Sequence, residues 1–366
     1  MTEHNSAKRI GSRISSRTGS SRTGVLVAQL GTPDAPTARA VRPYLRQFLS
    51  DRRVIDYHPL IWQPILRGAI LRTRPARSAR LYARIWTEEG SPLLVYSNAQ
   101  AEGLQQRLGD GYRVIVGMTY GNPSIGEAIR TLEAEGIDRI IVLPMFPQYS
   151  STTTASIYDA VYQAAAGRGP FFNRHKRFIP TLRFIEPYYD HPDYIEAMKQ
   201  HLEAQISALD HVPDKFVITY HGIPDRYVQT GDPYRRQCEQ TTQLLADAMG
   251  WRDDQWLISF QSRFGPENWL EPYTEDVLKG LAAQGVKRPL VFSPGFVTDC
   301  LETLDELGSE GRDQFEEGGG EGEYYRLAPC LNANPQWLDA MARLVRDNAG
   351  GWCEPVGARS STHEPR

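Results

Sequence analysis

Short apolar runs that alternate with helically spaced stretches are the feature of this sequence that most constrains its fold. The stretches between the runs repeat apolar residues at helical intervals, as Ile125, Ile129 and Leu132 do. Strands that alternate with helices form parallel sheets whose two faces are covered by helices. The sequence therefore predicts an α/β protein with doubly wound parallel sheets. The runs that have the length and aliphatic content of buried parallel strands are 24–30, 113–118, 139–145, 215–220, 255–260 and 288–293.

The two halves of the chain resemble each other. Residues 129–143 align without a gap with residues 278–292, at an offset of 149, and Leu30-Gly31-Thr32-Pro33 corresponds to His221-Gly222-Ile223-Pro224, at an offset of 191. Because the offsets differ, the first half contains an insertion. Chance similarity between two βα units is the alternative, but two matches in the same order favour a duplicated domain. Two such domains would form a cleft between them, outside the carboxyl ends of their strands.

Composition and charge exclude several classes of protein. The chain has 366 residues, with 41 Lys and Arg against 44 Asp and Glu, so its net charge of −3 argues against nucleic-acid binding through bulk electrostatics. No apolar run reaches the roughly 18 residues of a membrane-spanning helix. Glycine-rich nucleotide-binding motifs and the nucleophile elbow of hydrolases are absent.

The cysteines indicate a reducing compartment. Without a Cys-x-x-Cys pair, they predict neither a zinc ribbon nor a disulfide scaffold, and we expect free thiols in a cytoplasmic protein. They are Cys238, Cys300, Cys330 and Cys353.

Both ends of the chain look like tails. Residues 1–23 are rich in Arg and Ser and contain Glu3 as the only acid. An organelle transit peptide has a similar composition, but Ile10 and Ile14 are too few apolar residues for an amphipathic face. We expect a disordered tail there and a second tail over residues 351–366.

His221 is the first candidate functional residue. It follows the predicted strand 215–220 and precedes Gly222, at the position where the other half has the apolar Leu30. Ligand sites of open α/β sheets lie at the carboxyl ends of strands, and an imidazole titrates near neutral pH. A lone histidine is also a common structural residue, so its type alone leaves both interpretations open.

The segment after the strand 288–293 predicts a loop followed by a helix. Its cap is Thr298 or Asp299, since a side-chain oxygen accepts the first free N–H groups of a helix. Glu302, Glu306 and Glu310 follow at four-residue steps and share one face of that helix.

These three glutamates allow two interpretations. Carboxylates in a row repel one another, which is typical of a solvated acidic face. Alternatively, Glu302 lies in the first turn of the helix, near the strand ends where His221 is expected. An imidazole together with carboxylate oxygens suits Fe²⁺, Co²⁺ or Zn²⁺.

The insertion combines apolar residues with six arginines over residues 54–86, where Asp56 is the only acid. Such a segment suits an amphipathic, anionic ligand or the surface of an anionic membrane. A helical hairpin that packs on its own domain explains the pattern equally well.

Several motifs, in order and with matching spacing, resemble those of the ferrochelatase family. The resemblance covers residues from about 24 to 350 and is closest to the soluble Gram-negative bacterial type. The motifs are Leu-Gly-Thr-Pro-Asp-Ala-Pro-Thr (30–37), Trp-Thr-Glu-Glu-Gly-Ser-Pro-Leu (86–93), Tyr-Gly-Asn-Pro-Ser (120–124), Pro-Gln-Tyr-Ser (147–150), Tyr-His-Gly-Ile-Pro (220–224), Gly-Asp-Pro-Tyr (231–234), Gln-Ser-Arg-Phe-Gly (261–265) and Asp-Cys-Leu-Glu-Thr-Leu (299–304).

The resemblance implies a lyase that inserts Fe²⁺ into protoporphyrin IX, giving protohaem and two protons, as the final step of haem synthesis. It implies two similar Rossmann-like, chelatase-type domains with parallel sheets and an interdomain cleft. The expected boundaries are a tail over 1–23, a first domain over 24–165 with the insertion 54–86 as a lip of the porphyrin pocket, a second domain over 166–335, a helix over 336–350 that returns to the first domain, and a tail over 351–366.

The resemblance also assigns roles to single residues. His221 and Glu302 match the catalytic pair that faces the porphyrin, and both match metal ligands as well. Asp299, Glu306 and Glu310 match acidic positions on the route of the metal. The residues that match porphyrin-binding positions are Leu30, Tyr120, Tyr149 and Trp269.

At some positions the chain departs from the family pattern, and the roles of the family residues at those positions cannot be assigned to it. Cys300 stands where animal members have a second histidine, and Thr119 stands where they have an arginine that contacts the propionates. The cysteines that bind an iron–sulfur cluster in some members are missing.

We therefore expect no permanently bound cofactor and no iron–sulfur cluster, with Fe²⁺ and protoporphyrin IX as substrates. Transient contact with a membrane or with the preceding porphyrinogen oxidase is also expected, in the cytoplasm or at the periphery of the inner membrane. No nucleic acid is expected as a partner. The alternatives are a non-catalytic porphyrin or haem carrier on the same scaffold, and a cobalt or nickel chelatase that acts on a related tetrapyrrole.

Overall fold

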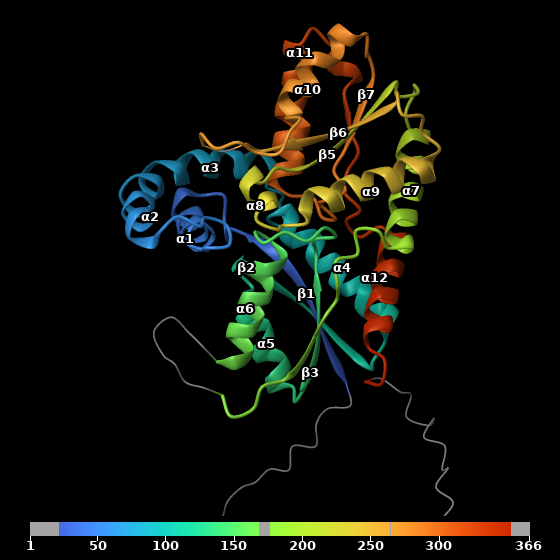
Figure 1. Ribbon diagram of the computed structural model, residues 1–366. Coiled ribbons are helices and arrows are strands. Elements are labelled where there is room, and N and C mark those ends of the chain that lie inside the picture. Colours follow the sequence, from blue (N-terminus) through green and yellow to red (C-terminus); the bar gives the residue numbers. More distant parts are fainter. Residues whose placement is uncertain (1–21, 168–175, 264, 353–366) are drawn as a thin grey trace, which may run out of the picture.

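Two four-stranded parallel sheets form the two halves of the computed structural model, which describes residues 22–167, 176–263 and 265–352 (Figure 1). The first sheet has the strand order β2–β1–β3–β4, and the second has the order β6–β5–β7–β8. The strands of the first sheet are β1 (Thr23–Thr32), β2 (Tyr112–Gly121), β3 (Arg139–Pro144) and β4 (Thr181–Phe184). Those of the second sheet are β5 (Lys215–His221), β6 (Trp256–Gln261), β7 (Pro289–Phe292) and β8 (Arg326–Leu327).

The equivalent strand orders confirm the predicted duplication and the α/β fold class. In each half the first strand lies between the second and the third, so β1 corresponds to β5. Both strands are buried along almost their whole length, which explains their continuous aliphatic runs. Leu30 and His221 therefore lie near the ends of equivalent strands, as the internal alignment predicted.

Helices cover both sheets. In the first half they are α1 (Ala38–Phe48), α2 (Pro59–Ile65), α3 (Leu71–Ile85), α4 (Pro92–Leu108), α5 (Ile125–Ala134) and α6 (Thr154–Ala166). In the second half they are α7 (Pro192–Ser207), α8 (Asp225–Gln229), α9 (Tyr234–Met249), α10 (Thr274–Leu281), α11 (Gly311–Glu317) and α12 (Pro335–Asn348). The π-helical segments are η1 (Leu66–Ile70) and η3 (Glu302–Glu310), and the 3₁₀ turns are η2 (Ala282–Gln284) and η4 (Gly322–Tyr324).

One apolar core runs through both halves. It includes Val27 of β1, Ile218 of β5 and Trp337 of α12, all of which are fully buried. The C-terminal helix α12 packs against α4 of the first half and α7 of the second. An ion pair of 2.5 Å between Arg107 Nε of α4 and Asp339 Oδ1 of α12 adds to this contact. The two halves are therefore joined by packing over a shared core.

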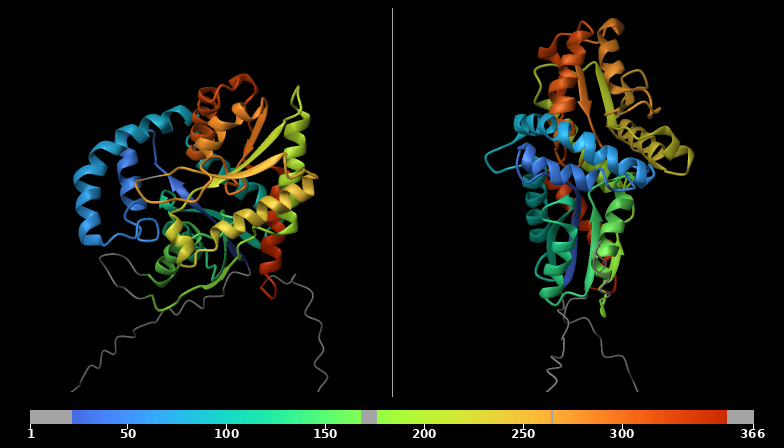
Figure 2. Two further views of the ribbon diagram at one scale, coloured as in Figure 1. Left: turned by 45° about the horizontal axis from the view of Figure 1, so that its top comes forward. Right: turned by 90° about the vertical axis from the view of Figure 1, so that its left-hand side faces the viewer.

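The insertion forms a helical unit with α1. The indole N–H of Trp62 in α2 donates to the carbonyl of Leu49 at 2.6 Å, and the buried Leu66 and Tyr82 belong to the same apolar cluster as Val41 of α1. The insertion therefore packs on its own domain, as one of its two interpretations predicted, but α2, η1 and α3 form one continuous helical run from Pro59 to Ile85 rather than a hairpin. Figure 2 shows α1, η1 and α3, in blue, crossing the junction between the two halves.

The structure corrects two boundaries of the sequence analysis. Strand β4 pairs with β3, so the first sheet extends to Phe184, beyond the predicted end of its domain at residue 165. The four-residue strand lacks an apolar run, which is why the sequence did not indicate it. Strand β1 begins at Thr23, inside the predicted N-terminal tail; residues 1–21 and 353–366 lie outside the described residues.

Candidate active site

His221 is the last residue of β5 and lies opposite Gln261, the last residue of β6. Its side chain is half-buried, and its Nδ1 atom lies 2.6 Å from the carbonyl oxygen of Gly222. Because a carbonyl oxygen can only accept a hydrogen bond, Nδ1 carries the proton. The neutral imidazole therefore has its lone pair on Nε2, the form required of a general base or a metal ligand.

The loop that contains Trp269 is held against the turn after His221. The two ring centroids are 6.5 Å apart, and the backbone N–H of Leu270 donates to the carbonyl of Ile223 at 3.1 Å. A Cβ atom on Gly222 would lie 3.0 Å from the backbone of β6 and 3.3 Å from the Trp269 ring. A side chain at this position would push the turn and the loop apart by a few tenths of an ångström, so glycine permits their close approach.

A cleft opens between the first domain, the insertion and the loop after β7. It encloses about 460 Å³ of empty space, its open mouth included. Its lining includes Leu30, Gly31 and Thr32 of β1, Tyr44 of α1, Tyr82 of α3, and Phe296, Cys300, Leu301 and Glu302. Mostly apolar walls with a few polar groups suit an apolar ligand with polar substituents. His221 is not among the lining residues; it stands at the end of β5, which neighbours β7 in the sheet.

Glu302 brings a carboxylate into this cleft opposite two tyrosines. Burial and the negative charge of Glu302 raise the pKa of Tyr44, so its hydroxyl remains a donor at neutral pH. The pKa of Tyr82 is raised by burial, then by Tyr44 and by Glu302. The rings of Tyr44 and Tyr82 meet edge to face, with centroids 6.3 Å apart. Neither tyrosine was predicted from the sequence, because no distinguishing pattern surrounds them.

Glu306 is anchored to the strand end beside His221. The hydroxyl of Ser262, which follows Gln261 of β6, donates to the Glu306 carboxylate. Burial first, and then the charge of Glu302, raises the pKa of Glu306 to about 7. Glu302 and Glu306 therefore interact, and an entirely solvated acidic face does not describe this pair.

The helix that contains the glutamates differs from the predicted one. Residues Glu302–Glu310 form a π-helix, and the helix starts without a side-chain cap, so the prediction of Thr298 or Asp299 as its cap was wrong. A π turn contains more residues than an α turn, so positions four apart fall just short of a full turn and still share a face. Such segments occur frequently at functional sites.

Asp299 is buried in a hydrogen-bond network of its own. Its Oδ1 atom accepts from the Thr303 hydroxyl at 2.9 Å and from the Cys330 N–H at 3.3 Å, while Oδ2 accepts from the Asn332 amide at 2.6 Å. These donors explain why Asp299 does not cap the helix. The carboxylate holds the loop before η3 against the loop after β8.

A second network joins this loop to the first domain. The Gln29 amide donates to the Thr298 hydroxyl at 2.9 Å, and that hydroxyl lies 3.1 Å from Gln100 Oε1. The amide of Gln100 also donates to the carbonyls of Val297 and Asn332, at 3.1 and 2.9 Å. The side chains of Gln29, Gln100 and Thr298 are all buried, so the position of the loop before Glu302 depends on the first domain.

Two predicted porphyrin-binding tyrosines lie outside the set of residues that line the cleft. Tyr120 is 4% exposed, and its hydroxyl donates to Asp51 at 2.6 Å. Tyr149 is half-buried, and its backbone N–H donates to Gln237 at 2.6 Å. Of the four predicted positions, Leu30 lines the cleft and Trp269 lies beside His221.

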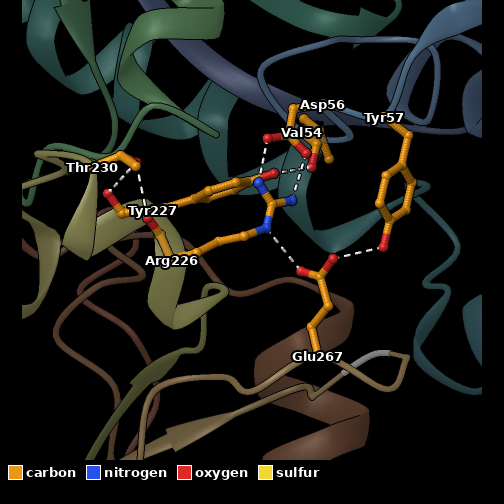
Figure 3. A network of polar contacts seen from close by, with 7 residues as sticks. All are labelled: Val54, Asp56, Tyr57, Arg226, Tyr227, Thr230 and Glu267. Atoms are coloured by element: carbon orange, nitrogen blue, oxygen red, sulfur yellow. Dashed lines mark hydrogen bonds and ion pairs between the residues drawn. The ribbon is translucent and has the colours of Figure 1, made fainter.

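A network of ion pairs connects the insertion with the second domain near this site (Figure 3). Arg226 of α8 binds Asp56 through both terminal nitrogens, and its Nε atom donates to Glu267 at 3.1 Å. The hydroxyl of Tyr57 donates to the other oxygen of Glu267 at 2.6 Å. Since Glu267 precedes Trp269 by two residues, the network links the insertion to the loop beside His221.

The side chains that could bind a metal ion do not cluster in the described part of the chain. Among the described residues, no set of three or more His, Cys, Asp and Glu side chains is arranged to hold a metal ion. The cysteines that the structure describes, Cys238, Cys300 and Cys330, are buried free thiols, while Cys353 lies outside the described residues. Burial raises the pKa of the Cys300 thiol, which lines the cleft beside Glu302.

The fold and the cleft define a two-domain α/β protein with a histidine and an acidic helix at neighbouring strand ends. The same fold occurs in the solved structure described as SirB from Bacillus subtilis with Fe³⁺, which is 12% identical with a TM-score of 0.52, over 90% of this chain and 96% of that one. At this identity the similarity establishes the fold alone.

Sequence comparison defines the family. The ferrochelatase family profile matches residues 22–349. The ferrochelatase of Alcanivorax borkumensis is 51% identical over 335 residues, 90% of this chain and 95% of that protein. The ferrochelatase of Marinobacter nauticus is 45% identical over 347 residues, 94% of this chain and 91% of that protein. The chain belongs to the ferrochelatase family: it is a lyase of haem synthesis that inserts Fe²⁺ into a porphyrin.

Proposed function

We propose that His221 and Glu302 perform the insertion of Fe²⁺ into protoporphyrin IX, giving protohaem and two protons. The observation that supports this most is the hydrogen bond from His221 Nδ1 to the Gly222 carbonyl, which leaves the lone pair on Nε2. Glu302 adds a carboxylate in the cleft that Leu30 also lines. An apolar Leu30 favours protoporphyrin IX over a porphyrin with more carboxylates, because its side chain offers no hydrogen bond.

The chemistry requires two pyrrole N–H protons to leave while Fe²⁺ sheds its water. A planar macrocycle holds its nitrogen lone pairs in the ring plane, and a cleft complementary to a bent ring directs them toward the metal. His221 Nε2 accepts pyrrole protons, binds the metal, or does both in turn. Carboxylate oxygens bind Fe²⁺ reversibly, which suits a ligand that must release the ion.

The acidic residues have graded roles in this proposal. Glu302 is the last protein ligand before the ring, while Glu306 and Glu310 pass Fe²⁺ along the face of η3. Glu310 is exposed, and Glu306 is half-buried, which gives the route an outer and an inner end. Asp299, whose carboxylate already accepts three hydrogen bonds, serves this route by holding the loop before η3 in place.

Leu30 and Trp269 are the proposed direct contacts of the porphyrin. Tyr120 is proposed to support the cleft indirectly. Its ring packs edge-on against Phe48, with ring centroids 5.3 Å apart, and its hydroxyl donates to Asp51. Tyr149 lies in the turn after β3 and is proposed to contact the porphyrin at the rim of the cleft. The insertion 54–86 forms the lip of the pocket, and Tyr82 at its end lines the cleft.

A peripheral membrane contact is proposed for the insertion. Helix α2 exposes apolar side chains at Leu60 (80%), Ile61 (65%) and Ile65 (46%), and exposed arginines follow it in α3. This combination suits an anionic bilayer surface or the porphyrinogen oxidase that delivers the substrate. None of the described helices has the length and apolar character needed to cross a bilayer.

The decisive assay mixes the purified chain with protoporphyrin IX and Fe²⁺ without oxygen and follows the absorbance band of haem. Turnover with Fe²⁺ is expected. A non-catalytic carrier would bind the porphyrin and show no turnover, and a cobalt or nickel chelatase would prefer those ions or a related tetrapyrrole. Either result would contradict the proposed reaction.

A further inference from the structure

Arg84, near the end of α3, forms an ion pair with Asp305 of η3. The Arg84 Nη1 atom lies 3.3 Å from Asp305 Oδ1. The Asp305 side chain is completely buried, whereas 58% of the Arg84 side chain is exposed. The guanidinium therefore covers a buried carboxylate from the solvent side, and it comes from the insertion rather than from the domain that contains η3.

The Asp305 carboxylate is only partly compensated. Its Oδ2 atom is buried and accepts no hydrogen bond within the described part of the chain. Burying an ionised carboxylate is costly unless both oxygens are satisfied, and one nitrogen at 3.3 Å satisfies only one of them. The Oδ2 atom therefore lacks the donor or cation that would offset its burial.

Asp305 immediately precedes Glu306 in η3, next to the carboxylates that we propose as the iron route. Its negative charge contributes to the raised pKa of Glu306, after burial, Glu302 and Glu310, and to that of Glu310, after burial. The positive charges of Arg84 and Arg77 act on Glu310 in the opposite direction. Arg84 thus interacts with two carboxylates of η3, those of Asp305 and Glu310.

The arginines of α3 therefore have a second role besides the proposed membrane contact. Arg74 is half-buried and interacts electrostatically with Glu306, while Arg77 and Arg84 interact with Glu310. These arginines supply counter-charges along the carboxylates of η3. A route of uncompensated carboxylates would hold Fe²⁺ too tightly to release it.

We propose that Arg84 sets the affinity of the acidic face for Fe²⁺ by occupying Asp305 in the resting protein and competing with the incoming ion. The inference rests on the proposed metal route and adds Asp305 to it as a ligand. On arrival of Fe²⁺ the guanidinium moves into solvent, where its exposed side chain has room. When the ion moves on to the ring, Arg84 returns to Asp305 and disfavours rebinding.

The test uses the full chain without porphyrin and Co²⁺ as an air-stable probe. Calorimetric titration measures the Co²⁺ affinity, and a thermal scan with and without Co²⁺ measures the stabilisation that the ion provides. The variants are Arg84→Gln, Arg84→Lys and Asp305→Asn. The matched control is Arg80→Gln, since Arg80 is an exposed residue of the same helix without an ion pair among the described residues.

Opposite effects of the two partners are expected. Arg84→Gln should bind Co²⁺ about fivefold more tightly, which corresponds to about 1 kcal/mol, and should gain more thermal stability from the ion than the wild type. Asp305→Asn should bind it several-fold more weakly, and Arg84→Lys and Arg80→Gln should resemble the wild type. A purely structural ion pair would lower the melting temperature of both partner variants without an opposite change in Co²⁺ affinity.

Unchanged or weaker Co²⁺ binding by Arg84→Gln would overturn the inference even if Asp305→Asn failed to fold. The test does not depend on turnover. A wild-type chain that forms haem normally while these affinities stay equal would refute the role of Arg84 and leave the proposed reaction intact. Opposite affinity changes in a chain that forms no haem would refute the reaction instead.

Discussion

Arg226 binds Asp56 through both terminal nitrogens of its guanidinium, joining positions 170 residues apart in the chain (Figure 3). The pair connects the insertion with helix α8, which begins shortly after His221 in the chain. We expect a flat, rigid ligand that enters or leaves the cleft to separate these parts. The Arg226–Asp56–Glu267 network is therefore suited to hold the cleft closed around a bound ring.

The first prediction concerns this network. Arg226→Ala should raise the rate of haem dissociation about three- to tenfold and leave the KM for Fe²⁺ unchanged, because the network touches the lip and not the metal route. Both side chains are about 40% exposed, so the loss of folding stability should stay near 1 kcal/mol or below. Stopped-flow transfer of haem to an apoglobin measures the rate.

Arg252→Ala is the control for that variant, since the ion pair of Arg252 with Asp254 is local and exposed. Equal haem dissociation from Arg226→Ala, the control and the wild type would show that the network is structural only.

The second prediction concerns the acidic residues of η3. Glu302→Gln should reduce kcat strongly, because the last ligand before the ring takes part in the chemical step. Glu310→Gln should mainly raise the KM for Fe²⁺ and leave the KM for the porphyrin unchanged. Steady-state kinetics with each substrate varied in turn separate these effects. If Glu306→Gln and Glu310→Gln both leave the metal dependence unchanged, only Glu302 is functional.

The third prediction concerns pH and Glu306, whose pKa is raised by burial first and by Glu302 second. A carboxyl with a raised pKa in the folded state binds its proton more tightly there than in the unfolded chain. Its contribution to stability therefore falls as pH rises from about 4.5, the ordinary value, to about 7, and stays low above that. Glu306→Gln removes this penalty.

The melting temperature of Glu306→Gln relative to the wild type should thus be higher at pH 8 than at pH 5, by roughly 2 °C or more. Calorimetry of the porphyrin-free and metal-free proteins measures it. The same difference at both pH values would mean that Glu306 titrates as an ordinary exposed carboxyl.

Much of the fold could be predicted because six of the strands, including the four-residue β7, are largely buried and lie in continuous apolar runs. The short strands β4 and β8 could not, since four and two residues at the edge of a sheet leave no such run. The π form of η3 could not be predicted either, because the spacing of Glu302, Glu306 and Glu310 fits one face of either kind of helix.

The candidate site was partly visible in the sequence. His221 stood out because the equivalent strand of the other half ends near the apolar Leu30. The network of Asp299 was not visible, because its partner Asn332 lies 33 residues away and is brought close only by the tertiary structure. Tyr44 was missed for a similar reason: helix α1 faces the cleft only after it packs against α3.

The fourth prediction is that the purified protein contains no [2Fe–2S] cluster. Such a cluster needs four thiolate ligands, whereas the described cysteines Cys238, Cys300 and Cys330 are buried at separate places, and burial raises the pKa of each thiol. Absorbance bands at about 400–550 nm together with acid-labile sulfide would contradict this prediction.

The most direct measurement of the central claim is a single-turnover experiment with His221→Ala. The variant and the wild type are each mixed with protoporphyrin IX and Fe²⁺ under anaerobic conditions, and porphyrin binding and haem formation are recorded separately. If His221 Nε2 acts on the ring nitrogens, the variant should bind the porphyrin measurably and form no haem. Haem formation within threefold of the wild-type rate would contradict the assignment of His221.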